Sequence, residues 1–232
     1  MPNIIELKQI NKIYGEKTQN PTQVIFDLNL DIQEHSFNSI IGQSGSGKST
    51  LLNILGTLDK ATSGDVLING KNTQKMTKNE LSNLRNETIG FIFQFHYLLP
   101  EYTALENVLM PYKISKKPMT KEILDRANEL LEIVGLTKVK HNLAINMSGG
   151  QQQRVAIARS LINNPKIILA DEPTGNLDSD TTEQVYTLLR EINARYQTTF
   201  IVITHDRHIA EKADRIIEIK DGRINLDIYK NA

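Results

Sequence analysis

A glycine-rich segment carries the residue types that bind phosphate groups. It follows the pattern GxxxxGK[ST] and consists of Gly42, Gln43, Ser44, Gly45, Ser46, Gly47, Lys48 and Ser49, followed by Thr50. Glycines let successive backbone N–H groups turn toward one anion, and the start of a helix adds positive potential. Lys48 would pair with the β- and γ-phosphates of a nucleotide, and the Ser49 hydroxyl would bind Mg²⁺. The segment therefore predicts a site for ATP with Mg²⁺, and an ordinary Gly/Ser turn is the alternative.

Two carboxylates follow the unbroken apolar run Ile167–Ala170. Such a run is typical of a strand that is buried on both faces. Beside a phosphate loop, a carboxylate at the end of a strand is suited to hold Mg²⁺, so we predict this role for Asp171. Glu172 lies one residue further out and would take a proton from the attacking water. A merely solvated acidic pair is the alternative, and the upstream phosphate loop argues against it.

These segments can form one site only if a sheet brings them together. Short β-branched runs alternate with helical patterns, which predicts an α/β protein of the P-loop NTPase class with a parallel-rich sheet. Core strands are expected over Phe37–Ile41, Ile89–Phe93, Ile167–Ala170 and Phe200–Ile203. Alternating patterns predict an antiparallel β edge subdomain over Ile4–Leu7, Leu28–Ile32 and Val66–Ile68. They also predict a C-terminal hairpin over Arg215–Ile219 and Arg223–Ile228, with its turn at Asp221 and Gly222.

Apolar residues at helical spacing predict the helices. These are expected over Thr50–Leu58, Lys121–Val134, Val155–Ile162 and Gln184–Arg195. Gly135 is placed to end the second of them. Residues 94–147 give no good strand signal, which indicates an inserted α-helical lobe at about 94–164. We therefore expect one domain over residues 1–232, with the core and its β edge at about 1–93 and 165–232.

The composition excludes several classes of protein. The 232 residues include 27 Lys and Arg against 27 Asp and Glu, and a zero net charge argues against a protein that coats nucleic acid. Without cysteine, neither a disulfide framework nor a thiolate metal site is possible. The sequence has no apolar run long enough to span a bilayer, and its N-terminus lacks the apolar core of a signal peptide. A role at a membrane would therefore need a membrane-spanning partner.

A second segment suited to an anion points to a family. It contains Ser148, Gly149, Gly150 and Gln151, and it resembles the signature of the ATP-binding subunits of ABC transporters. Met147 departs from the leucine most common there, but its similar volume should pack alike. The resemblance covers Ile4 to about Gly222. It implies that the signature binds the γ-phosphate of ATP held by another copy of the chain, and hence that the protein acts as a homodimer.

Other motifs of this family occur in its usual order. Tyr14 resembles the aromatic residue that stacks on adenine, although ordinary packing is the alternative. Gln94 resembles the Q-loop residue, which contacts Mg²⁺ or the water, and Asp178 resembles the D-loop residue at the dimer interface. His205 resembles the switch histidine that contacts the γ-phosphate. His35 stands where the family commonly has glycine, and we interpret it as a variation in a turn, because histidine tolerates left-handed backbone.

The stretch Gly90–Pro111 resembles one group within the family, the lipoprotein-releasing LolD group with its MacB-like and FtsE-like neighbours. This resemblance implies a peripheral ATPase on the cytoplasmic side of the inner membrane that drives lipoprotein release. Its partners would be integral membrane permease subunits of the LolC and LolE type, with lipoproteins as indirect cargo and no nucleic acid. The alternative is the ATPase of a MacB-like efflux complex or an FtsE-like transmembrane signalling complex.

The same stretch contains apolar residues that suit a docking surface. Phe95, Tyr97, Leu98 and Leu99 are too apolar for a free loop, and we expect them to form the floor of a groove for a coupling helix of the permease. The alternative is that they cap the core of the helical lobe.

Two other functions fit the motifs less well. Ribosome-acting members resemble two cassettes in one chain and DNA-repair members carry a long coiled coil, whereas this sequence has one cassette and no sustained heptads. A non-catalytic adaptor is not expected, because Lys48, Asp171, Glu172 and His205 are all present. The unfused chain favours a separate ATPase subunit over a MacB-like fusion to a membrane segment.

Overall fold

The computed structural model describes residues 1–230. Its strands are β1 (Asn3–Tyr14), β2 (Thr22–Gln33), β3 (Phe37–Ile41), β4 (Ser63–Ile68), β5 (Lys71–Asn72), β6 (Ile89–Phe93), β7 (Ile167–Asp171), β8 (Thr199–Ile203), β9 (Arg215–Lys220) and β10 (Arg223–Tyr229). Its α-helices are α1 (Lys48–Leu55), α2 (Lys78–Thr88), α3 (Ala104–Ile114), α4 (Lys121–Ile133), α5 (Gly149–Leu161), α6 (Ser179–Tyr196) and α7 (Arg207–Ala210). None of the helices in this part of the chain is long and apolar enough to span a bilayer.

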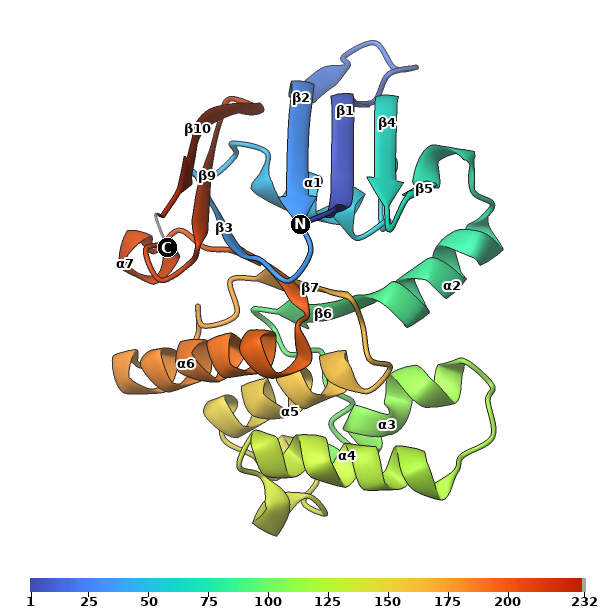
Figure 1. Ribbon diagram of the computed structural model, residues 1–232, viewed down its shortest axis with the longest axis vertical. Helices are drawn as coiled ribbons and strands as arrows, with labels where there is room; N and C mark the ends of the chain where they lie inside the picture. Colours follow the sequence, from blue (N-terminus) through green and yellow to red (C-terminus); the bar gives the residue numbers. More distant parts are fainter. Residues whose placement is uncertain (231–232) are drawn as a thin grey trace.

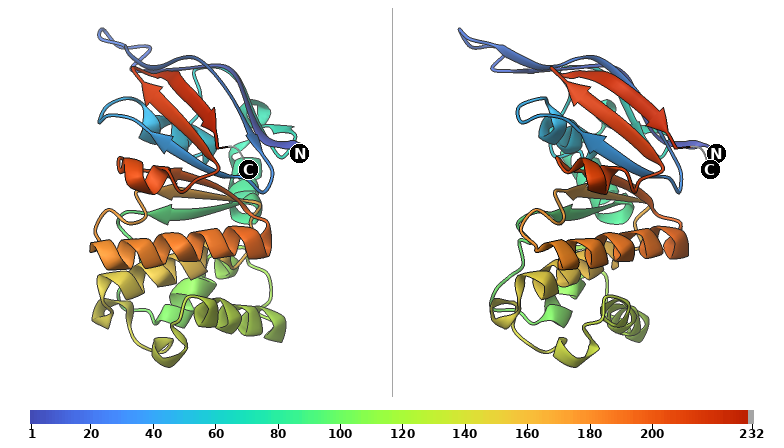
Figure 2. Two further views of the ribbon diagram at one scale, coloured as in Figure 1. Left: turned by 60° about the vertical axis from the view of Figure 1, so that its left-hand side comes forward. Right: turned by 90° about the vertical axis from the view of Figure 1, so that its left-hand side faces the viewer.

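Two sheets organise the molecule (Figure 1). The larger has the order β10-β9-β3-β8-β7-β6. All its neighbouring strands pair in parallel except the hairpin of β9 and β10. The smaller sheet, β2-β1-β4-β5, is antiparallel. Figure 2 shows the larger sheet between the smaller one and the layer of helices α3 to α6.

The central strands of the larger sheet are buried on both faces. Along β7, Ile167 and Leu169 join the hydrophobic core that contains α1 and the small sheet. The residues between them, Ile168 and Ala170, join the other core, which contains α3 to α6. A strand with alternate residues in two cores has to be apolar throughout, which explains its unbroken apolar sequence.

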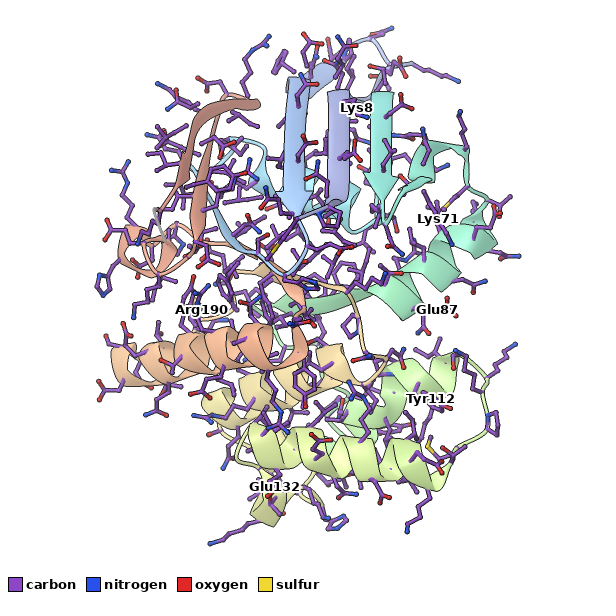
Figure 3. The ribbon with its side chains drawn as sticks, in the orientation of Figure 1. Lys8, Lys71, Glu87, Tyr112, Glu132 and Arg190 are labelled. Carbon is purple, nitrogen blue, oxygen red and sulfur yellow. The ribbon has the colours of Figure 1, made fainter. Side chains whose placement is uncertain are left out.

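Helix α6 is tied to the sheet by an arginine. Arg190 projects from α6 (Figure 3), with its guanidinium 4.8 Å from the centre of the Phe37 ring on β3. It also lies 2.9 Å from the carboxylate of Asp214, just before β9. This contact holds α6 against the sheet at the point where β3 and β9 begin.

The predicted strands are confirmed, but β1 and β2 are much longer than the predicted Ile4–Leu7 and Leu28–Ile32. All four core strands form, and β7 and β8 each include one more residue than expected. The antiparallel edge and the C-terminal hairpin also form as predicted. His35 has a φ of 64°, so our interpretation of this position as a left-handed turn is confirmed.

The helix ends were predicted less well. Helix α4 ends at Ile133, one residue before the predicted end, and Gly135 follows its C-cap Val134 with a φ of 73°. The start predicted for α5 at Val155 is wrong, because the helix already begins at Gly149. Helix α1 runs from Lys48 to Leu55 instead of from Thr50 to Leu58, and α2 was not predicted at all. The division of the chain into a core and a helical lobe stays a prediction.

Candidate nucleotide-binding site

The phosphate loop lies between β3 and the first turn of α1. Gly42 and Gly47 have φ values of 154° and 105°, which strain any residue with a side chain. A Cβ at Gly42 would also overlap the carbonyl oxygen of Ile219 on β9. The first N–H groups of α1 have no partner within the helix, because the helical bonds start one turn later. Glycines thus let the chain enter α1 with these N–H groups available to an anion.

Lys48 is held over this loop. Its Nζ donates hydrogen bonds to the carbonyl oxygens of Gly42 and Gln43, each at 2.8 Å. Ser49, beside it in the first turn of α1, is exposed. Within residues 1–230, the hydrogen-bond partners of the ammonium are neutral carbonyls of its own loop, so a phosphate would offer it a stronger, charge-assisted interaction.

Several segments distant in sequence surround one hollow of about 570 Å³ beside the phosphate loop. Its lining includes most of the predicted site residues, namely Ser44, Gly45, Gly47, Lys48, Ser49, Thr50, Gln94, Asp171, Glu172 and His205. The parallel strands β3, β6, β7 and β8 all end here. This common edge is why four separate motifs lie together.

Asp171 and Glu172 lie side by side at the end of β7. Burial, together with the neighbouring Glu172 carboxylate, raises the pKa of Asp171, and the Lys48 ammonium only partly offsets this. The Glu172 carboxylate lies 2.8 Å from Nδ1 of His205, a residue whose side chain is 73% exposed. The backbone of Glu172 is left-handed, with a φ of 46°. Two adjacent carboxylates with one lysine nearby make a strongly acidic site that favours a cation.

The loop after Glu172 is bound to the loop after β6. Asn176 donates from Nδ2 to the carbonyl oxygen of Gln94 at 3.2 Å, and the two side-chain amides lie 3.5 Å apart. A Cβ on Gly175 would come within 2.7 Å of the Gln94 amide nitrogen, so a larger residue here would displace the Gln94 side chain from this position. Gln94 was predicted to act at the site, but its contact with Asn176 and Gly175 was not predicted, because it joins segments far apart in the chain.

Two predicted site residues have other partners in this structure. Tyr14 does not line the hollow, and its hydroxyl lies 3.0 Å from the Asp59 carboxylate. Asp178 caps α6, where its carboxylate accepts hydrogen bonds from the N–H and the hydroxyl of Thr181. These bonds lower the pKa of Asp178. The roles of Tyr14 toward adenine and of Asp178 at a dimer interface stay predictions.

The signature residues lie outside the hollow, at the start of α5. Ser148 is the N-cap and accepts a hydrogen bond from the N–H of Gln151, whose side chain accepts one from the N–H of Ser148 in return. This reciprocal pair stabilises the helix start. Gly149 and Gly150 occupy the first turn, and a Cβ on Gly150 would lie 3.0 Å from the Thr181 methyl group. The chain thus carries a second helix N-terminus suited to an anion, separate from the phosphate loop.

The phosphate loop leads to a direct prediction for Lys48→Ala. We expect its affinity for Mg-ATP to fall by about 100-fold, because hydrogen bonds to charged groups contribute about 1.5–3 kcal/mol each and this lysine would make more than one. Equilibrium titration with a fluorescent ATP analogue measures the change. Lys60→Ala is the matched control, because Lys60 is outside the lining of the hollow and its ammonium contacts the carbonyl oxygen of Met76. An affinity of Lys48→Ala within a few-fold of the wild type would contradict the role.

Comparisons with known proteins agree with this geometry. A family model described as ABC transporter matches residues 25–175. The chain is 46% identical to the lipoprotein-releasing system ATP-binding protein LolD 1 of Rhodopseudomonas palustris, over 97% of this chain and 99% of that protein. It is 50% identical to the macrolide export ATP-binding/permease protein MacB of Aggregatibacter actinomycetemcomitans, over 98% of this chain but only 35% of that protein.

The fold has a close match among solved structures. The dimeric post-hydrolysis structure of the ATP-binding cassette MJ0796 with ADP and Pi superimposes with a TM-score of 0.89 and is 42% identical, covering 98% of this chain and 99% of that one. The α/β cassette fold predicted from the sequence is therefore confirmed. With its phosphate loop and carboxylate pair at one sheet edge, the chain belongs to the ABC transporter family and is one of its ATPase cassettes.

Proposed function

We propose that this cassette hydrolyses ATP to drive the release of lipoproteins from the inner membrane. ATP hydrolysis, the enzymatic part of this proposal, is supported by one hollow that brings together the catalytic residue types. These are Lys48, Asp171, Glu172 and His205. The cargo is supported by near full-length relatives named for lipoprotein release, at 46% and 49% identity. The cassette would be peripheral, on the cytoplasmic side of that membrane. A MacB-like efflux complex is the second candidate, supported by 50% identity to the MacB cassette, and an FtsE-like complex is a third.

The donors in the hollow fit a magnesium ion. The Ser49 hydroxyl, the Asp171 carboxylate and the Gln94 side-chain oxygen are hard oxygen donors of the kind that Mg²⁺ prefers. A divalent cation would also relieve the repulsion between Asp171 and Glu172 that raises the pKa of Asp171. When bound, the ion would neutralise charge on the β- and γ-phosphates.

Glu172 is the residue best placed to activate water. Its carboxylate faces the hollow, and His205 holds one of its oxygens at 2.8 Å. The other oxygen could accept a proton from a water molecule that attacks the γ-phosphate. Lys48 and the N–H groups of α1 would hold that phosphate in place during the attack. His205, released from Glu172, could then donate to the phosphate.

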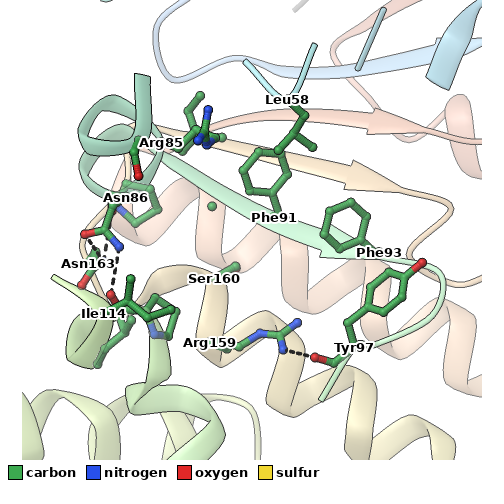
Figure 4. Close-up of a pocket in the computed structure, with 16 residues that line it drawn as sticks. Leu58, Arg85, Asn86, Phe91, Phe93, Tyr97, Ile114, Arg159, Ser160 and Asn163 are labelled. Atoms are coloured by element: carbon green, nitrogen blue, oxygen red, sulfur yellow. Dashed lines mark hydrogen bonds between the residues drawn. The ribbon is translucent and has the colours of Figure 1, made fainter. Parts of the chain in front are cut away.

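A groove on another face of the molecule fits a permease segment. It encloses about 420 Å³ between α2, β6 and α5 (Figure 4). Phe91 and Phe93 stack 5.6 Å apart along it, and Tyr97 meets Phe93 edge to face at 5.4 Å. Of the apolar stretch expected to form the floor, only Tyr97 lines this groove. Phe95 and Leu98 line a neighbouring hollow, which Tyr97 also borders, and Leu98 also packs on the core of the helices.

The groove is positively charged as well as apolar. Its lining includes Arg85 and Arg159 but no acidic residue. Arg159 donates to the carbonyl oxygens of His96 and Tyr97 at 2.6 and 2.7 Å, and burial lowers its pKa. An amphipathic helix that carries an acidic residue would complement this surface. We propose that such a coupling helix, from a permease subunit of the LolC or LolE type, docks here.

The role of Glu172 predicts a trapped state in Glu172→Gln. The substitution keeps the shape of the side chain but removes the basic oxygen, so turnover should fall by about 10²–10⁴-fold. ATP should still bind, and a dimer closed on ATP should accumulate, because opening follows hydrolysis. Phosphate release and size-exclusion chromatography with Mg-ATP measure the two effects.

Asp171→Asn is the contrasting variant, because it should weaken Mg²⁺ binding and fail to trap the dimer. Near-normal turnover in Glu172→Gln would refute the role.

The docking groove predicts uncoupling in Tyr97→Glu. The new carboxylate would lie beside Arg159, which donates a hydrogen bond to the carbonyl oxygen of residue 97, and would compete with an acidic residue of the permease. ATP binding should stay within twofold of the wild type, while ATP-driven release of a lipidated protein from proteoliposomes should fall about tenfold or more, as expected for loss of a central interface residue. Phe95→Glu is the matched control, because Phe95 is equally exposed and lies outside the groove.

The same assay tests the cargo. Wild-type complex that exports a macrolide but releases no lipoprotein would contradict lipoprotein release and favour the MacB-like candidate. Full release by Tyr97→Glu in a complex that assembles normally would contradict docking at this groove.

A further inference from the structure

The turn that follows Glu172 is held by hydrogen bonds to neighbouring elements as well as by a bond of its own. The left-handed backbone of Glu172 is fixed by a hydrogen bond from its N–H to the carbonyl oxygen of Ile203 on β8, at 2.9 Å. The N–H of Gly175 closes the turn by donating to the carbonyl oxygen of Glu172 at 3.0 Å. The position of the carboxylate therefore depends on how the peptide groups of this turn are held.

One of these peptide groups is bound by a residue of the signature helix. Gln153 on α5 has no exposed surface, and its Nε2 donates to the carbonyl oxygen of Pro173 at 2.5 Å. Pro173 directly follows Glu172. Gln153 lies five residues after Ser148 on the same helix, and five residues of α-helix rise only about 7.5 Å. A single rigid element thus carries the second anion-binding helix start and a hydrogen bond to the turn of Glu172.

Packing does not explain an amide at this position. Within the described chain, Oε1 of Gln153 is buried and has no hydrogen-bond partner. A buried, unpaired oxygen is unfavourable, and an apolar side chain of the same length would fill the space without it. What the amide provides, and an apolar side chain cannot, is the donor to Pro173.

We infer that Gln153 is a positioning residue that links the signature helix to Glu172. A shift at the N-terminus of α5, where an anion would bind, moves Gln153 with the helix and, through the carbonyl group of Pro173, moves Glu172. The hydrolytic carboxylate is then fully aligned only when α5 is in place. This inference rests on the proposed role of Glu172 as the base.

A double-mutant cycle separates this role from a structural one. Gln153→Met keeps the length and volume of the side chain and removes the donor. We expect its kcat to fall about 10- to 100-fold, as for a misplaced catalytic group, with the KM and the Kd for ATP within twofold of the wild type. In the Glu172→Gln background, the same substitution should lower the residual single-turnover rate by less than twofold, because the base through which it acts is already gone.

Gln152→Met is the matched control. Gln152 is the neighbouring residue of the same type, but its Nε2 donates to the carbonyl oxygens of Ala144 and Met147 and not to the turn of Glu172. It should therefore keep a kcat within twofold of the wild type. If Gln153→Met melts more than a few degrees below the wild type, Gln153→Asn takes its place, since that amide is one methylene too short to reach Pro173.

Three results would overturn the inference. One is an unchanged kcat in a folded Gln153 variant, and the second is an equal fall in rate with and without Glu172. The third is a fall in Gln152→Met as large as in Gln153→Met, which would mean that α5 is disturbed in general. A normal rate in the Glu172→Gln single variant would contradict the proposed role of Glu172 as the base. Because this result comes from a different variant, it can be distinguished from a failure of the inference about Gln153.

Discussion

The parallel pairing of four short strands is the constraint on which the site depends. One motif lies at the end of each strand: the phosphate loop at β3, Gln94 at β6, the Asp171–Glu172 pair at β7 and His205 at β8. Parallel strands end at the same edge of a sheet, so pairing alone brings these segments together. A slip of one residue would exchange the side chains between the two cores on either face of the sheet. The packing of α1 on one face and α5 and α6 on the other therefore also fixes the site.

Charge at this edge explains why the site needs a ligand. Asp171 and Glu172 repel each other in a partly buried position, and the raised pKa of Asp171 means that its ionised form costs folding free energy at neutral pH. That cost is absent below the ordinary pKa of aspartate and grows as the pH rises through this range. A bound cation would remove much of it. The hollow, with its two carboxylates, suits a nucleotide that carries a cation. The groove around Arg159 has the opposite charge and suits an acidic partner.

The sequence was sufficient where structure follows from a local pattern. The core strands are apolar runs because they are buried on both faces, and the phosphate loop is recognisable because its glycines have to adopt positive φ. Helix α5 was misplaced because Gly149 and Gly150 suggest a loop. The capping box of Ser148 and Gln151 lets the helix start at these glycines. Helix α2 was missed because it is mostly polar, with Leu81 and Leu84 as its buried apolar residues.

Contacts between distant segments could not be predicted in the same way. The hydrogen bond of Asn176 to Gln94 depends on the pairing of β6 with β7, and that of Gln153 to Pro173 depends on how α5 packs against the sheet. No local pattern encodes either bond. Asp178 shows that a residue recognised from a family motif can also have a local structural role. It resembles the D-loop residue and also caps α6. Sequence identified the residue types of the site, and the tertiary structure was needed to show which residues hold the others in position.

The central claim is that a complete site consists of the phosphate loop of one chain and the signature of another. It is tested most directly by mixing Lys48→Ala chains with Ser148→Arg chains and measuring ATP hydrolysis. Each variant alone should be nearly inactive, because every site in its dimer lacks one part. A mixed dimer keeps one site in which both parts are intact, so the mixture should recover hydrolysis that neither parent shows. Ser148→Arg homodimers that hydrolyse ATP at the wild-type rate would contradict the shared site.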